Sequence, residues 1–236
     1  MKNIIYAGSS FAKTSFAPEP NAPVTNLQKE LGLIAIDVSK CAIGNIEILS
    51  RVQEQIVLGK KLNKPVQGIV WVYAEPLVEI ELAGELAMKD FLTQAELTNY
   101  KAYTELNHTI LDLINSIGIP VALIGGHADI DQKIHRGNIT VLHPSWQRYL
   151  IDSIGYDYVD GWEERTGWGA DIVHRWMQLL DVNPSPDLAR RISETFFVWS
   201  LIEKQNLWWE THPSYEGTQI FASKIKSNFF DWIEKI

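Results

Sequence analysis

The sequence is poor in cysteine, with Cys41 alone among its 236 residues. A single cysteine excludes an internal disulfide bond and any metal cluster built from cysteine ligands. A lone cysteine is most often a small buried hydrophobic residue, and we expect this of Cys41. No motif in the sequence requires a cofactor or a metal ion, and we expect neither.

Long apolar runs and clusters of basic residues are also missing. No apolar stretch reaches the roughly 20 residues that span a bilayer. The run after Lys2 is also shorter than the roughly 7–15 apolar residues of a signal peptide, so we expect a cytoplasmic protein without a membrane partner. The net charge is -8, and nucleic-acid binding depends on clustered Lys and Arg, so we do not expect nucleic acid as a partner.

The signatures of phosphate binding are absent too. Neither GxxxxGK[ST] nor GxGxxG occurs, and the stretch SSFAKTS (9–15) is only loosely suited to hold a phosphate. Nucleotide or flavin binding is therefore the weakest of the functions that we consider.

Tryptophan, in contrast, is abundant. The chain has nine tryptophans, and seven of them follow residue 160. Large aromatic side chains dominate the packing of protein cores, so we expect most of them there. A stacking surface for sugars or other flat ligands is the alternative use of such a dense cluster.

Apolar strands and amphipathic helices alternate along the chain, which predicts an α/β fold. We expect a flavodoxin-like three-layer α/β/α sandwich with a mostly parallel five-stranded sheet. Residues 1–236 would form one domain, in which residues 145–207 are a helical lid inserted before the last helix. Thr93 and Glu96 resemble a capping box at the start of a helix. The strands are expected at 3–7, 33–38, 66–73, 119–126 and 138–142, and the main helices at 26–32, 45–62, 93–116, 185–206 and 215–236.

Polar residues follow several of the predicted strands, at the edge where parallel sheets bind ligands. The turn GSSF (8–11) contains Ser10, and a Glu-Thr-His-Pro stretch (210–213) with His212 precedes the last helix. Both segments have plain interpretations as a tight turn and a loop. A serine nucleophile, however, needs a base within hydrogen-bond reach, and His212 can supply it, with Glu210 to orient the imidazole.

These segments resemble motifs of the SGNH (GDSL-type) hydrolases. The first motif of that family is Gly-Asp-Ser after the first strand, and the last is Asp-x-x-His, often continued by Pro and, a few residues later, by Gly. The corresponding residues here are Gly8-Ser9-Ser10 and Glu210-Thr211-His212-Pro213, with Gly217 following. The resemblance implies a nucleophilic Ser10, a basic His212 and an orienting Glu210. It also implies that the Gly44 amide, in a segment that looks like the second motif, helps to form an oxyanion hole.

The chain departs from the family pattern at the acid. The family places its acid three residues before the histidine, where this chain has Trp209, and Glu210 is one position closer. On an extended segment that shift moves the carboxylate to the opposite face, although a turn can restore it.

A second departure concerns the oxyanion hole. The third family motif, Gly-x-Asn-Asp, is replaced by WVYAEPLV (71–78), in which Glu75 stands near the place of the asparagine. Losing such a donor costs on the order of 10²–10³ in rate. We expect Asn45 as a substitute donor, and Glu75 must be protonated or turned away to be harmless.

Two other histidines are candidates for the site. His127 lies near Asp129 and Asp131, but no second histidine stands at ligand spacing, so a metal site is disfavoured. We expect His127 in an ordinary loop or at the substrate cleft. His143-Pro144 repeats the His-Pro pair and is a weaker candidate for the base.

The sequence thus predicts a serine hydrolase that cleaves a carboxylic ester through an acyl-enzyme. The substrate would be a small-molecule or carbohydrate ester, such as an O-acetyl group on a sugar. The alternative is a catalytically impaired protein of the same fold that uses its Trp-rich surface to bind a glycan or a protein.

Overall fold

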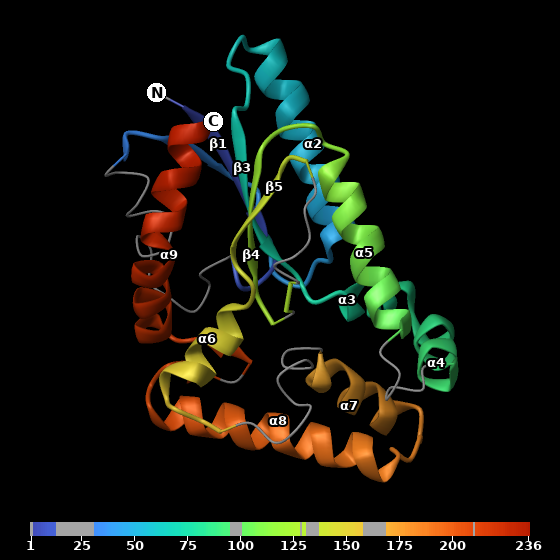
Figure 1. Cartoon of the computed structure of the whole chain (residues 1–236). Helices are drawn as coiled ribbons and strands as arrows, with labels where there is room; N and C mark the ends of the chain where they lie inside the picture. Colours follow the sequence, from blue (N-terminus) through green and yellow to red (C-terminus); the bar gives the residue numbers. More distant parts are fainter. Residues whose placement is uncertain are drawn as a thin grey trace.

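A computed structural model describes residues 2–12, 31–94, 101–127, 129–130, 137–157, 169–209 and 211–236. Its centre is a five-stranded sheet in the order β2-β1-β3-β4-β5, with every neighbouring pair parallel (Figure 1). This is the flavodoxin-like strand order, in which the chain switches direction between β1 and β3. The predicted fold class is confirmed. The strands are β1 Asn3–Gly8, β2 Ile34–Asp37, β3 Gly68–Tyr73, β4 Val121–Gly125 and β5 Ile139–His143.

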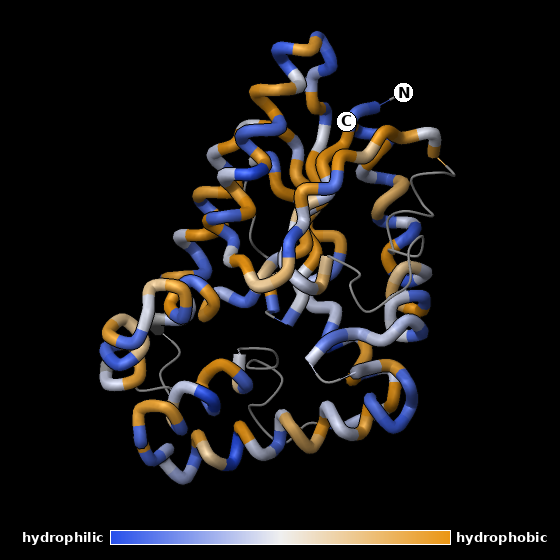
Figure 2. Tube along the Cα trace, turned by 180° about the vertical axis from the view of Figure 1, so that it is seen from behind, coloured by the Kyte–Doolittle hydropathy of each residue, from blue (hydrophilic) through white to orange (hydrophobic). Residues whose placement is uncertain are grey.

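Helices cover both faces of the sheet. α2 (Asn45–Lys61) and α5 (Lys101–Asn115) lie on one face, and α6 (Trp146–Ser153) and α9 (Tyr215–Lys235) lie toward the other. All six residues of β3 are buried because a parallel strand packs against helices on both sides. Figure 2 shows the resulting apolar centre of the molecule between helices of mixed polarity.

Alternate residues of the strands serve two separate cores, as the pleat of a strand requires. Ile69 and Trp71 of β3 belong to the cluster beneath α2 and α5, whereas Val70 and Val72 belong to the cluster beneath α9. Each cluster contributes to stability because burying apolar area is worth about 25 cal/mol per Å².

Four more helices gather near the carboxyl ends of the strands. They are α3 (Leu77–Ala83), α4 (Glu85–Gln94), α7 (Ala170–Leu179) and α8 (Pro186–Lys204). Figure 1 shows α7 and α8 across that edge of the sheet, and a third apolar cluster joins α3, α4, α7 and α8. The predicted insertion between β5 and α9 is thus helical in its described part. Its role as a lid stays a prediction.

A two-stranded hairpin precedes α9, where the sequence predicted a loop. β6 (Trp208–Trp209) pairs antiparallel with β7 (His212–Pro213), so that Trp209 stands opposite His212. Gly217 in the first turn of α9 lies so close to the hairpin that an added Cβ would run into the Leu207 carbonyl oxygen. Glycine is needed here for close approach.

Two local predictions are wrong. Thr93 is not an N-cap: it lies inside α4, where its hydroxyl donates to the Lys89 carbonyl at 2.8 Å, as a threonine within a helix commonly does. Cys41 is exposed, because it lies in the loop between β2 and α2 and not in an element that faces the core. Most of the predicted helix at 26–32, and Glu96, lie outside the described residues. Among the described helices, none has both the length and the apolar character needed to cross a membrane.

Candidate active site

Ser10 and His212 meet at the carboxyl edge of the sheet although 202 positions separate them in sequence. The distance between Ser10 Oγ and His212 Nε2 is 2.6 Å, which is within hydrogen-bond range. Ser10 reaches this place because the chain turns sharply after β1 at Gly8, where an added Cβ would lie 2.8 Å from the Val72 carbonyl oxygen. The Ala12 amide closes that turn by donating to the Ser9 carbonyl at 3.0 Å. The two residues that the sequence predicted as nucleophile and base thus lie in contact, and their catalytic roles stay predictions.

The second ring nitrogen of His212 contacts its own chain neighbour. Nδ1 lies 2.9 Å from the hydroxyl oxygen of Thr211. Burial, and then the adjacent His127, lowers the pKa of His212 to about 4, while Asp171 acts in the opposite direction. The imidazole is therefore neutral at pH 7 and is able to accept a proton from the serine hydroxyl.

His127 lies beside this pair, and the centres of the His127 and His212 rings are 6.3 Å apart. Its Nε2 is 2.8 Å from the backbone oxygen of Thr211. Because a carbonyl only accepts hydrogen bonds, this nitrogen carries a proton and donates. Burial lowers the pKa of His127, so the ring is neutral. The structure thus places His127 against the hairpin behind the base.

Asp129 does not join His127 in a cluster of ligands. Its carboxylate pairs with Arg148 at 2.7 Å, and burial raises its pKa to about 7 despite that contact. Asp131 lies outside the described residues.

Asn45 is committed to a structural position. Its side-chain oxygen accepts from the Trp71 indole and from the Ala74 amide, both at 3.1 Å, and its nitrogen donates to the Ala74 carbonyl at 2.9 Å. The residue is buried and fixes the carboxyl end of β3 to the start of α2. These contacts do not support the prediction of Asn45 as a substitute oxyanion donor, and we do not assign it that role.

Gly44 directly precedes α2, as predicted, but a carboxylate lies against it. The Glu79 side chain occupies the space that a Cβ on Gly44 would fill, and it accepts from the Ile46 amide at 3.1 Å. An anion is favoured at this place by the positive end of the helix dipole. Sequence reasoning missed Glu79, because it comes from α3, in a stretch whose structure the sequence left open. The role of the Gly44 amide stays a prediction.

Glu75 follows β3 and is almost completely buried. Burial raises its pKa well above the usual value, which favours the protonated, uncharged form of the side chain. It packs against the start of α7, where an added Cβ on Gly169 would lie 3.1 Å from Glu75 Cγ. The shift is toward protonation, which is one of the two conditions under which Glu75 is harmless to an oxyanion.

Asp171, in the first turn of α7, is an acid that no motif indicated. Its charge acts on His127, His212 and Glu75 alike, which places it on the same side of the sheet edge. One of its oxygens is buried without a hydrogen-bond partner among the described residues. Only the packing of the insertion brings this residue to the site, so a local pattern could not have found it.

Glu210, the predicted orienting acid, lies outside the described residues, and its role stays a prediction. Trp209 stands where the family has its acid. It is 51% exposed and pairs across the hairpin with His212. An aromatic surface therefore lies next to the base.

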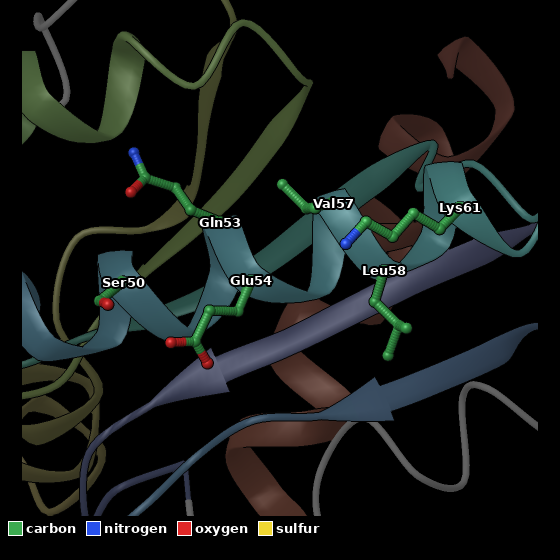
Figure 3. Close-up of a pocket in the computed structure, with 6 residues that line it drawn as sticks. All are labelled: Ser50, Gln53, Glu54, Val57, Leu58 and Lys61. Atoms are coloured by element: carbon green, nitrogen blue, oxygen red, sulfur yellow. The ribbon is translucent and has the colours of Figure 1, made fainter.

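A separate open depression of about 370 Å³ lies along α2 (Figure 3). Its lining comes from this helix alone and is mixed in polarity, with Val57 and Leu58 beside Glu54 and Lys61. It extends toward the end of α2 remote from Asn45, whereas Ser10 and His212 lie at the carboxyl edge. We assign it no role in the chemistry.

No family model matches the chain, and no curated protein matches it. Solved structures with a similar overall trace include the psychrotrophic esterase EstA from a Pseudoalteromonas species, at 10% identity and a TM-score of 0.44, over 99% of this chain and 100% of that one. An acetyl xylan esterase, AlAXEase, is 12% identical with a TM-score of 0.42, over 96% and 98% of the two chains. A lipase/acylhydrolase from Enterococcus faecalis is 11% identical with a TM-score of 0.42, over 97% and 95%. These likenesses are too distant to assign an activity, which must be argued from the site itself.

Proposed function

We propose that this protein hydrolyses a carboxylic ester, with Ser10 as nucleophile and His212 as general base. The observation that carries the proposal is the 2.6 Å contact between Ser10 Oγ and His212 Nε2. A serine hydroxyl is a weak nucleophile unless a neighbouring base takes its proton, and this contact supplies such a base. The low pKa of His212 keeps that base in its reactive neutral form at neutral pH.

The reaction would proceed in two stages, acylation of Ser10 and hydrolysis of the acyl-enzyme. Ser10 Oγ attacks the ester carbonyl carbon while His212 Nε2 takes its proton, and the imidazolium then gives that proton to the departing alcohol. The resulting acyl-enzyme is attacked by water, from which His212 removes a proton. The acid product leaves when the Ser10 oxygen recovers a proton from His212. The scheme requires no cofactor.

The proposed site has fewer groups to stabilise the tetrahedral intermediate than the family pattern provides. The proposed donors are the backbone amides of Ser10 and Gly44. A side-chain donor equivalent to the family asparagine is not supplied by Asn45, and losing one such donor costs on the order of 10²–10³ in rate. We therefore expect slow turnover.

The alcohol portion of the substrate would lie near Trp209. Its half-exposed indole stands across the hairpin from His212, and an indole face stacks well on the apolar face of a sugar ring. This position supports an O-acylated carbohydrate as substrate, beside simple small-molecule esters.

The test is hydrolysis of p-nitrophenyl acetate by the full chain. We expect turnover that Ser10→Ala abolishes, whereas Ser9→Ala, in the same turn, retains at least half of the activity. A wild-type protein with no turnover above the Ser10→Ala background would contradict the proposal.

A binding protein on the same fold is the second candidate. The Glu79 carboxylate against Gly44 favours it, since an anion there opposes a developing oxyanion. In that case esters would remain intact, and a glycan would quench tryptophan fluorescence in wild type and in Ser10→Ala alike.

A further inference from the structure

Thr211 lies between two histidines: its hydroxyl contacts the ring of His212, and its carbonyl contacts the ring of His127. We propose that Thr211 is a positioning residue: its hydroxyl fixes the ring of His212, and His127 fixes the Thr211 backbone. This inference rests on the proposed function, because it concerns how the base is presented to Ser10. It gives a neutral hydroxyl a part in the orienting role that a carboxylate has in the familiar triad, beside the acid predicted at Glu210.

The neutral His212 ring carries a single proton. In the reactive arrangement the Ser10 hydroxyl donates to Nε2, which must then be the unprotonated nitrogen. The proton is therefore on Nδ1, and among the described residues the Thr211 hydroxyl oxygen lies within hydrogen-bond range of it, at 2.9 Å. That oxygen accepts the hydrogen bond and selects the tautomer that leaves Nε2 free to act as base.

The backbone of Thr211 is held by His127. His127 donates through Nε2 to the Thr211 carbonyl at 2.8 Å, and the neutral state of His127 leaves it this one ring proton. The His127 ring is itself held by aromatic neighbours, with Phe11 edge-on at 4.4 Å and Trp199 stacked at 5.7 Å. Both neighbours are buried, so the position of the donor is well fixed.

The hairpin completes the arrangement. Thr211 lies in the turn between β6 and β7, and pairing of Trp209 with His212 closes that turn. Threonine is branched at Cβ, which limits χ1 and keeps the hydroxyl in place. A continuous set of contacts thus runs from His127 through Thr211 and His212 to Ser10.

A neutral orienting group has a chemical consequence. A carboxylate at Nδ1 would favour the charged imidazolium and raise the pKa of His212, whereas a hydroxyl gives little such support. Among the described residues, the titratable groups that act on His212 are His127, which lowers its pKa, and Asp171, which raises it. The Thr211 contact thus orients the ring while the pKa of His212 stays at about 4, so the base remains neutral in mild acid.

The test compares Thr211→Val, which has the same shape without a hydroxyl, with Thr211→Ser, which keeps the hydroxyl. ¹⁵N NMR of histidine-labelled full-length protein reports the tautomer of His212 directly. We expect the Nδ1–H tautomer in wild type and Thr211→Ser, and a shift toward Nε2–H in Thr211→Val. With p-nitrophenyl acetate, kcat should fall about tenfold in Thr211→Val, the value of one neutral hydrogen bond, with KM unchanged.

A second pair of variants examines the backbone contact. His127→Phe keeps an aromatic ring beside Phe11 and Trp199 but removes the donor, and we expect it to lower kcat and to weaken the tautomer preference of His212. His127→Gln retains an N–H that can reach the same carbonyl and should restore both. This pair also serves if Thr211→Val does not fold.

The outcomes separate the two proposals. An active wild type whose kcat and His212 tautomer are the same in Thr211→Val would overturn the positioning role and leave the hydrolase intact. An inactive wild type in which Thr211→Val still changes the tautomer would overturn the hydrolase and leave the positioning contact intact.

Discussion

The chain contains the tripeptide His-Pro-Ser twice, at 143–145 and at 212–214, and the two copies build the same local structure. Each histidine lies in a strand, and each serine caps the helix that follows. Ser145 accepts from the Arg148 amide and Ser214 from the Gly217 amide, both at 3.1 Å. Proline keeps the preceding histidine extended, and serine is a favoured N-cap, so local sequence accounts for both copies.

The two histidines differ in what the rest of the chain brings to them. His143 packs against Tyr149 and Phe221, and its Nδ1 accepts from the Ser145 amide at 3.3 Å. His212 faces the Ser10 hydroxyl instead. Burial lowers the pKa of both rings to about 4, so a depressed pKa does not distinguish a base from a packed ring. The partner residue does.

The third helical position is another difference between the copies. Gly217 lets the first turn of α9 touch the hairpin that carries His212. The equivalent Arg148 of α6 reaches out to pair with Asp129. Close approach of backbone to backbone therefore belongs only to the copy that presents a histidine to serine.

Replacing each histidine in turn should give the largest difference in activity between the two copies. His212→Ala should lower kcat/KM for p-nitrophenyl acetate by at least about 10³-fold, because the serine loses its base. His143→Gln, which keeps a polar side chain against the Ser145 amide, should stay within about threefold of wild type. Similar losses in both variants would show that the two copies are not functionally distinct.

Gly217→Ala should have the next largest effect. The added methyl group meets the Leu207 carbonyl and must displace the hairpin, and a displacement of about 1 Å at a catalytic group can cost on the order of 10² in rate. Arg148→Ala, the equivalent site in the other copy, should leave kcat nearly unchanged. A Gly217→Ala protein with full activity would show that the hairpin tolerates movement.

The pH dependence of kcat/KM reports the pKa of the base. Since His212 must be neutral to act and its pKa is about 4, kcat/KM should stay level from pH 7 to about pH 5 and fall near pH 4. Thr211→Asp should move this acid limb to higher pH, because a carboxylate stabilises the imidazolium. A wild-type limb at the ordinary histidine pKa of about 6.5 would contradict the buried environment.

The free energy of unfolding should depend on pH because the pKa values of His143 and His212 are lowered in the folded chain. The unfolded chain takes up histidine protons near pH 6.5 but the folded chain near pH 4, so the free energy of unfolding should decline as pH falls through this window. Thermal unfolding followed by circular dichroism at pH 7 and pH 5 measures it. Variants His143→Gln and His212→Gln should each reduce the decline.

The smallest expected effect concerns the two helix caps. Ser145→Ala and Ser214→Ala should each lower the free energy of unfolding by at least about 1 kcal/mol, since each removes the N-cap hydrogen bond. Each also removes the bond that the hydroxyl donates to a backbone carbonyl, that of Gly126 for Ser145 and that of Asn206 for Ser214. Urea unfolding of both variants checks this. Clearly unequal losses would mean that the copies are not locally equivalent.

Local patterns predicted the sheet, the helix at 45–62 and the position of Ser10 after the first strand, because each depends on apolar periodicity or on a strand end. The pairing of His212 with Ser10 was predicted from the need of a serine nucleophile for a base and from the family resemblance. Local patterns did not indicate that Thr211 and Asp171 lie at the site. Thr211 matters through contacts with His127, and Asp171 through the packing of α7, both long-range features. No local pattern showed that Asn45 binds the end of β3, because that contact depends on how α2 packs against the sheet.

The proposal that His212 activates Ser10 is tested most directly by the rate at which a fluorophosphonate probe labels the protein. The modified residue is mapped by mass spectrometry. The contact between Ser10 and His212 predicts a single adduct on Ser10, formed at the same rate in wild type and His143→Gln and lost in His212→Ala. Absence of an adduct on Ser10 in wild type, or equal labelling after His212→Ala, would contradict it.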